Sequence, residues 1–148
     1  MPSNTNKPTH HNGSRLQRLA PDPSTARHVA WNFAQRLAGR STAHIARRLD
    51  ERSIPGPSGA DPGRNPHRTH HGWSLRTVTE ILRNPRYTGY QVWNRSSCDR
   101  ADRSPTGRRP STRNPRTEWA ISTRIAHQPL ASEQNFLAAQ AIQAQKTK

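Results

Sequence analysis

The stretch that decides the fold is WSLRTVTEILRNPRYTGYQVWN, residues 73–94. Four apolar residues recur at helical spacing within the segment 74–83 and are expected to point inward: Leu75, Val78, Ile81 and Leu82. Ser74 is the expected N-cap of this helix. Asn84-Pro85 ends it, because the residue before a proline avoids the helical conformation. The stretch therefore predicts a short helix with one buried face.

The opposite face of the same helix carries side chains that suit the edges of base pairs: Arg76, Thr77, Glu80 and Arg83. Arginine can hold guanine through two hydrogen bonds, threonine can contact the methyl group of thymine, and a carboxylate can accept from cytosine. The pattern favours a helix that binds in the major groove of DNA. A small helical bundle with a solvated face is the alternative.

Two further helices are predicted upstream, over 24–38 and 41–52, with Ser24 and Ser41 as N-caps. The expected inward residues are Ala26, Val29, Ala30, Phe33 and Leu37 in the first helix and Ile45, Ala46 and Leu49 in the second. Only Gly39-Arg40 separates the two helices. A two-residue link with glycine is typical of a helix-turn-helix corner.

Downstream, the segments 90–95 and 117–125 are predicted strands. In the second, Trp119, Ile121, Thr123 and Ile125 alternate with polar or small residues, as in a half-buried strand. The residues between them, 96–116, include six arginines and predict a long, flexible, basic hairpin arm. A last helix is expected over 132–145, with Ser132 as N-cap and with Phe136, Ala139 and Ile142 or Gln143 on one face.

The sequence thus predicts an α+β fold, with a small helix-turn-helix-like core, a β-hairpin with a long basic arm and a C-terminal helix. Residues 21–145 are the expected domain, between a disordered tail at 1–20 and a short tail at 146–148. The segment 55–72, rich in proline and glycine, is expected to be a flexible loop without a regular element. The four tryptophans are expected to serve the core, since apolar residues make up only 29% of the chain.

Charge is the main indication of function. The 148 residues include 24 lysines and arginines against nine acidic residues, which gives a net charge of +15. Twenty-one of the 24 are arginines, whose planar donor fork matches phosphates and guanine. This composition favours nucleic acid as the partner. On composition alone, binding without sequence preference is as compatible as binding to a specific site.

Several classes of protein and of site are excluded or disfavoured. No apolar run approaches the roughly 20 residues that cross a bilayer, so no membrane association is expected, and the N-terminus has no apolar signal region. Cys98 is the single cysteine, which excludes an internal disulfide and a multi-cysteine zinc module. His67, His70 and His71 lie close together, but they lack acidic or cysteine ligands at metal-binding spacing. We predict no catalytic residue, no cofactor and no metal, and residence in the cytoplasm at the nucleoid.

Three motifs resemble the recombinase domain of the large serine recombinases, particularly the actinobacterial kind. They are VAWNFAQRLAGRSTAHIARRLDERSIPGPSG, WSLRTVTEILRNPRYTGYQVWN and EWAISTRIAHQPLASEQNFLAAQ, and the resemblance extends from Asp22 to Gln143. The middle motif carries the most specific likeness, with Trp73, Asn84-Pro85, Gly89 and Trp93 at the spacing of the family.

The resemblance implies a DNA-binding module that holds half of an attachment site. In the family, a separate N-terminal domain supplies the nucleophilic serine, and a zinc-ribbon domain usually follows. We expect neither in this sequence, so recombination by the chain alone is not expected. The alternatives are a sequence-independent basic binder and a truncated gene remnant. Expected partners are double-stranded DNA and either a separate catalytic subunit or a second copy of the chain on a palindromic site.

The residues expected to contact DNA fall into three groups. Arg76, Thr77 and Arg83 are expected near bases. Arg47, Arg48, Arg86 and Arg95 are expected near phosphates. Arg108, Arg109 and Arg113 are expected on the basic arm.

Overall fold

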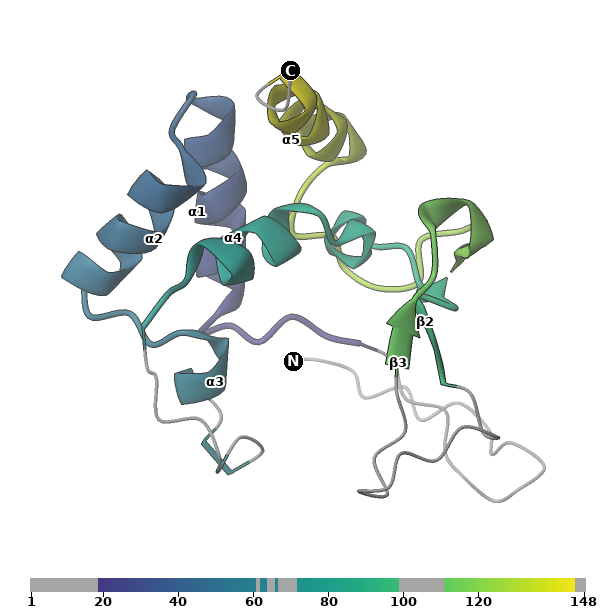
Figure 1. Cartoon of the computed structure of the whole chain (residues 1–148), viewed down its shortest axis with the longest axis horizontal. Helices are drawn as coiled ribbons and strands as arrows, with labels where there is room; N and C mark the ends of the chain where they lie inside the picture. Colours follow the sequence, from purple (N-terminus) through teal and green to yellow (C-terminus); the bar gives the residue numbers. More distant parts are fainter. Residues whose placement is uncertain (1–18, 61, 64–65, 67–71, 99–110, 146–148) are drawn as a thin grey trace. The chain divides into compact units, whose positions relative to one another are not determined.

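The computed structural model describes residues 19–60, 62–63, 66, 72–98 and 111–145 (Figure 1). The chain divides into two compact units. The helical unit comprises Asp22–Thr88 and Pro129–Lys148, and the strand unit comprises Met1–Pro21 and Gly89–Gln128. Helices, short antiparallel strands and a C-terminal helix together confirm the predicted α+β class.

The helical unit contains five α-helices and one 3₁₀ turn in its described residues: α1 (Ala26–Leu37), α2 (Thr42–Glu51), α3 (Pro57–Ala60), α4 (Leu75–Leu82), η1 (Pro85–Thr88) and α5 (Glu133–Gln145). Helix α1 packs against α2, α4 and α5, and α2 also packs against α4. The first and last helices of the unit therefore enclose one core, although most of the strand unit separates them in the sequence.

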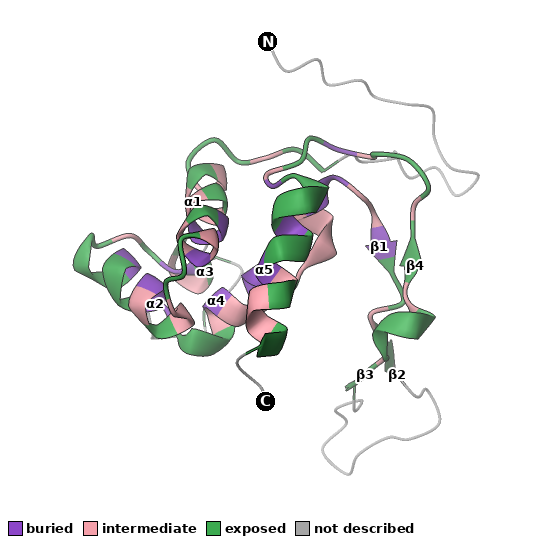
Figure 2. Cartoon of the chain, turned by 90° about the horizontal axis from the view of Figure 1, so that it is seen from above, coloured by how far each residue is buried: buried purple, intermediate pink, exposed green. Residues whose placement is uncertain are grey.

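The core of the helical unit is small and well buried. Ile45 and Leu49 of α2 and Val78 of α4 are fully buried. The ring of Phe33 lies 6.4 Å from that of Tyr87 in an edge-on arrangement and 6.3 Å from that of Phe136, between ring centroids. Figure 2 shows α1, α2, α4 and α5 each with both buried and exposed positions, as expected for helices around one core.

Three of the four predicted N-caps are confirmed. The hydroxyl groups of Ser41, Ser74 and Ser132 each accept a hydrogen bond from the backbone N–H three residues later, at 3.0–3.1 Å. The prediction for Ser24 is wrong, because the cap position is Thr25 and its side chain makes no capping bond. The N-cap therefore lies one residue later than predicted, and the carbonyl of Asp22 accepts from the N–H of Ala26 at 2.8 Å.

Two predicted inward residues face solvent. Leu75, the first residue of α4, is 54% exposed, and the buried residues of this helix are Val78, Ile81 and Leu82. Ala30 is also exposed. Helix α1 instead buries Asn32, Phe33 and Arg36.

The ends of α1 and α2 have the same geometry. Gly39 has a φ of +85°, and the N–H groups of Gly39 and Arg40 donate to the carbonyls of Arg36 and Gln35. This is a Schellman motif, in which glycine is the favoured residue. After α2, Ser53 takes the glycine position with a φ of +54°, and the N–H of Ile54 donates to the carbonyl of Leu49.

The segment 55–72 was predicted to have no regular element, but it contains α3 at Pro57–Ala60. Directly after this segment, Trp73 donates two hydrogen bonds to the end of α2 and the residues that follow it. Its backbone N–H donates to Oδ1 of Asp50 at 2.8 Å, and its indole Nε1 donates to the carbonyl of Ile54 at 3.0 Å. The end of α2 therefore fixes the start of α4.

The strand unit contains two short antiparallel ladders. Strand β1 (Val92–Trp93) pairs with β4 (Ala120–Ile121), and β2 (Ser96–Cys98) pairs with β3 (Ser111–Arg113). A 3₁₀ turn, η2, spans Arg116–Glu118. The first ladder confirms that the two predicted strands pair, but they are much shorter than 90–95 and 117–125. The predicted arm 96–116 contains its own ladder at its base.

The prediction of a half-buried strand at 117–125 is wrong. Strand β4 has only two residues, and Ile121 and Ile125 are 52% and 58% exposed. The expectation of core tryptophans holds for Trp73, which is buried, and fails for Trp93, which is 52% exposed. Trp31 packs partly buried against the core. None of the described helices is long and apolar enough to cross a membrane.

Candidate nucleic-acid interface

Helix α4 presents a polar face opposite its buried one. Arg76 and Arg83 are exposed and Glu80 is half-buried. These three residues are four and then three positions apart, so they lie along one side of the helix. Arg83 is the C-cap residue, so this face extends over the full length of α4. Two donor forks at opposite ends of one helix are suited to contacts with separate bases or phosphates.

Thr77 is half-buried, and its side chain takes part in the N-cap. Its Oγ1 lies 2.9 Å from Oγ of Ser74, and its backbone N–H donates to the same Ser74 oxygen at 3.0 Å. The hydroxyl group thus serves the start of the helix. The methyl group is the part of Thr77 that suits a contact with thymine.

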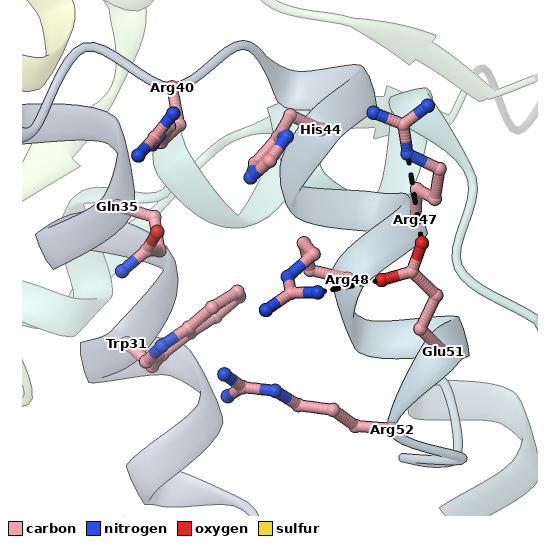
Figure 3. Close-up of a pocket in the computed structure, with 8 residues that line it drawn as sticks. All are labelled: Trp31, Gln35, Arg40, His44, Arg47, Arg48, Glu51 and Arg52. Atoms are coloured by element: carbon pink, nitrogen blue, oxygen red, sulfur yellow. Dashed lines mark hydrogen bonds and ion pairs between the residues drawn. The ribbon is translucent and has the colours of Figure 1, made fainter.

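A cavity of about 390 Å³ lies between α1 and α2 (Figure 3). Its charged lining residues are Arg40, Arg47, Arg48, Glu51 and Arg52. Trp31, Gln35 and His44 complete the lining. Four arginines against one glutamate give the lining a net charge of +3 when His44 is neutral, so the cavity favours an anion.

Two of these arginines, Arg47 and Arg48, were predicted from the sequence to contact phosphates. Nη1 of Arg48 donates to Oε2 of Glu51 at 3.0 Å, and Nε of Arg47 lies 4.0 Å from Oε1 of the same residue. All three side chains are about half exposed or more. Exposed pairs of this kind contribute about 0–1 kcal/mol, so Glu51 holds the two arginines only weakly.

Sequence reasoning missed the other side of the cavity. The guanidinium carbon of Arg52 lies 5.0 Å from the ring centroid of Trp31, in a cation–π contact. The sequence could have indicated Arg40, His44 and Arg52 as neighbours of Arg48, because these four residues follow one another at intervals of four. The contribution of Trp31 could not be found in this way, because it comes from α1.

Arg86 lies in η1, where it is half-buried. Its backbone N–H donates to Oδ1 of Asn84 at 3.2 Å, and its side-chain Nε is buried. A guanidinium group with a buried Nε has fewer donors to offer a phosphate than that of Arg76 or Arg83. Its expected contact with DNA remains a prediction.

In the strand unit, two arginines lie close to the ring of Trp119. The guanidinium carbons of Arg95 and Arg116 lie 5.1 and 5.4 Å from its ring centroid. The indole Nε1 donates to the carbonyl of Asn114 at 3.0 Å, which fixes the ring. The structure therefore orients Arg95, a predicted phosphate contact, and adds Arg116 beside it.

The remaining predicted residues are on the arm. Arg113 lies in β3, opposite Ser96, and is exposed. Arg108 and Arg109 lie outside the described residues, as do His67, His70 and His71. Within the described part of the chain, no group of three histidine, cysteine or acidic residues could hold a metal ion.

A comparison with families of known proteins found a matching family. The family model described as Recombinase matches residues 23–146. The chain belongs to the recombinase family. The match covers both the helical unit from α1 to α5 and the described part of the strand unit after residue 88. Searches of the curated proteins and of the solved structures found no match to this recombinase chain.

Proposed function

We propose that this chain binds double-stranded DNA as the site-recognition module of a site-specific recombination system. The observation that carries the proposal is the exposed face of α4, with Arg76 and Arg83 at its two ends. Its buried residues Val78, Ile81 and Leu82 anchor the helix in the core. A rigid helix with two outward arginines suits direct contacts to guanine in the major groove.

Arginines suited to the DNA backbone support the same function. Phosphate contacts position a protein on the duplex, while base contacts specify the sequence. We assign Arg47, Arg48, Arg86 and Arg95 to the first role, together with Arg108, Arg109 and Arg113 of the arm. Arg76, Thr77 and Arg83 have the second role.

The proposed role is binding and not strand cleavage. In the large serine recombinases that the chain resembles, the nucleophilic serine belongs to a separate domain, so we assign DNA recognition alone to residues 23–146. The partner in strand exchange is then a catalytic subunit or a second copy of the chain on a palindromic site. Such a module acts on DNA in the cytoplasm, at the nucleoid.

Selection of bound duplexes from a random-sequence DNA pool, at near-physiological salt, tests this function. Enrichment of a repeated motif is the expected result, and that motif would give the attachment half-site. Recovery of unenriched DNA would contradict it and favour the second candidate, binding driven by charge alone. The net charge of +15 is the observation behind that candidate, which predicts equal affinity for any duplex of the same length.

A further inference from the structure

The cavity between α1 and α2 has a charge that the base-reading face of α4 does not explain. Its lining carries a net charge of +3, while the lining includes one acidic residue, Glu51. Glu51 already accepts a hydrogen bond from Arg48, which shows that an oxyanion fits beside this guanidinium group. Figure 3 shows the ends of Arg48 and Arg52 directed toward Trp31, with Arg40 and His44 beyond them.

Two cations of the cavity are positioned by the structure, Arg52 through its side chain and Arg40 through its backbone. Trp31 packs partly buried against the core, so its ring is a fixed surface on α1. Arg52 lies over that ring at 5.0 Å and directly follows the last residue of α2. Arg40 lies before the start of α2, at the opposite end of the helix from Arg52. The Schellman motif fixes its backbone, because the N–H of Arg40 donates to the carbonyl of Gln35. Cations that are positioned before binding lose less side-chain entropy when they meet an anion.

We propose that this cavity is a phosphate-binding pocket that holds one phosphodiester group of the DNA backbone. The inference rests on the proposed function, because it takes DNA as the source of the anion. Helix α2 packs against α4, so a duplex bound by α4 brings its backbone to the neighbourhood of α2. In helix-turn-helix proteins, the helix packed on the reading helix crosses the backbone in the same way. Arginine forks match the oxygens of a phosphate.

The test uses the salt dependence of binding to a short duplex of arbitrary sequence. For each phosphate that a protein neutralises, the slope of log K against log salt steepens by about 0.9. The variants are Arg40→Gln, Arg52→Gln and the double variant, and the matched control is Arg27→Gln. Arg27 is exposed on α1, outside the cavity lining, and its replacement removes the same charge as either single variant.

If one phosphate occupies the pocket, the double variant flattens the slope by about 0.9, and not by twice that amount. The control leaves the slope unchanged. A reduction of about 1.8 in the double variant would mean two separate phosphates and would overturn the single pocket. Unchanged slopes, or an equal reduction in the control, would also overturn it. Thermal unfolding of each variant checks that the helical unit remains folded.

A competition experiment locates the anion and separates a DNA phosphate from the free ion. Inorganic phosphate should weaken duplex binding by the wild-type chain more than chloride does at equal ionic strength. The two salts should act alike on the double variant, and a persisting excess effect of phosphate would place the site elsewhere and overturn the proposal. A chain that binds no duplex would contradict the proposed function itself. Duplex binding with unchanged slopes would contradict only the pocket.

Discussion

The guanidinium group of Arg36, on α1, donates a hydrogen bond of 2.8 Å from Nη2 to Oε1 of Gln143, on α5. Its Nη1 donates to the carbonyl of Arg40 at 2.9 Å. Arg36 is only 1% exposed, so both bonds lie inside the helical unit. This one side chain thereby joins the α1–α2 turn to a helix that lies 107 positions along the chain.

Replacing Gln143 by alanine should therefore destabilise the protein. The change removes an acceptor from a buried cation, and hydrogen bonds to charged groups contribute about 1.5–3 kcal/mol. We expect the free energy of unfolding in urea to fall by about that amount. Gln145→Ala is the control, since Gln145 is exposed at the end of the same helix. Equal midpoints of urea unfolding for the two variants would show that the Arg36–Gln143 hydrogen bond contributes nothing to the free energy of unfolding.

A second stability prediction concerns the end of α2. Ser53 has a φ of +54°, a conformation that costs a residue with a side chain about 1–2 kcal/mol. Glycine avoids this cost but loses more entropy on folding, by about 0.5–1 kcal/mol. Ser53→Gly should therefore raise the free energy of unfolding by about 0.5–1 kcal/mol. Ser53→Ala keeps the strained backbone and should not raise it. A gain in the alanine variant would mean that the hydroxyl group, and not the backbone, is unfavourable.

The helices were predictable from the sequence because their starting signals are local. Ser41, Ser74 and Ser132 each precede an apolar residue series, and each caps a helix in the structure. The burial of Arg36 was not predictable. Arginine is seldom buried without partners, and its two acceptors are a backbone carbonyl and a residue from the far end of the chain.

For the strands and the cavity too, the sequence pattern could not predict how distant parts of the chain pack together. Alternation at 117–125 predicts a strand with one covered face, but only a covering layer can bury Ile121 and Ile125, and both are more than half exposed. The positions of Arg47 and Arg48 on α2 followed from helical spacing. The cavity beside them depends on how α1 packs against α2, which the sequence pattern does not determine.

The stabilisation that Asp22 gives to the start of α1 should depend on pH. The hydroxyl group and the backbone N–H of Ser24 donate to Oδ1 of Asp22 at 2.7 and 2.9 Å, and they lower the pKa of that carboxyl group from its ordinary value of 3.8. The folded pKa lies below the unfolded one. The stabilisation is therefore present above pH 3.8 and is lost as the pH falls through the folded pKa.

Ser24→Ala removes the stronger of the two bonds, so the pKa of Asp22 should rise toward its ordinary value. Carboxyl chemical shifts followed by NMR measure this directly. The variant should be less stable than the wild type at neutral pH and equal to it in strong acid. A pKa that does not move would assign the shift to the backbone N–H of Ser24 and the side chain of Thr25.

The face of α4 gives a prediction on specificity. Arg76→Ala together with Arg83→Ala should cost about 1–3 kcal/mol for each arginine that holds a base through two hydrogen bonds, and should relax the sequence preference. Binding to the selected motif and to a scrambled duplex measures both effects. The control is Arg27→Ala with Arg124→Ala, which removes the same charge from exposed positions on α1 and after β4. If the α4 double variant kept its preference, the bases would be read by another part of the chain.

The last prediction concerns Glu51, the acidic residue that faces the arginines of the cavity. Its carboxylate lies 3.0 Å from Nη1 of Arg48 and 4.0 Å from Nε of Arg47, so under the proposed function it would compete with DNA phosphates for both cations. Glu51→Gln removes that competition and also a negative charge that repels the DNA backbone. We expect tighter duplex binding at low salt and a steeper salt slope, because more counterions are released.

The stability cost of this change should be small, since exposed pairs contribute about 0–1 kcal/mol. Glu133→Gln is the matched control, because it removes one carboxylate from an exposed position on α5, away from the cavity lining. An equal gain in affinity from both variants would assign the effect to net charge alone. Tighter binding by Glu51→Gln but not by Glu133→Gln would show that Glu51 restrains the arginines of the cavity until a phosphate replaces it.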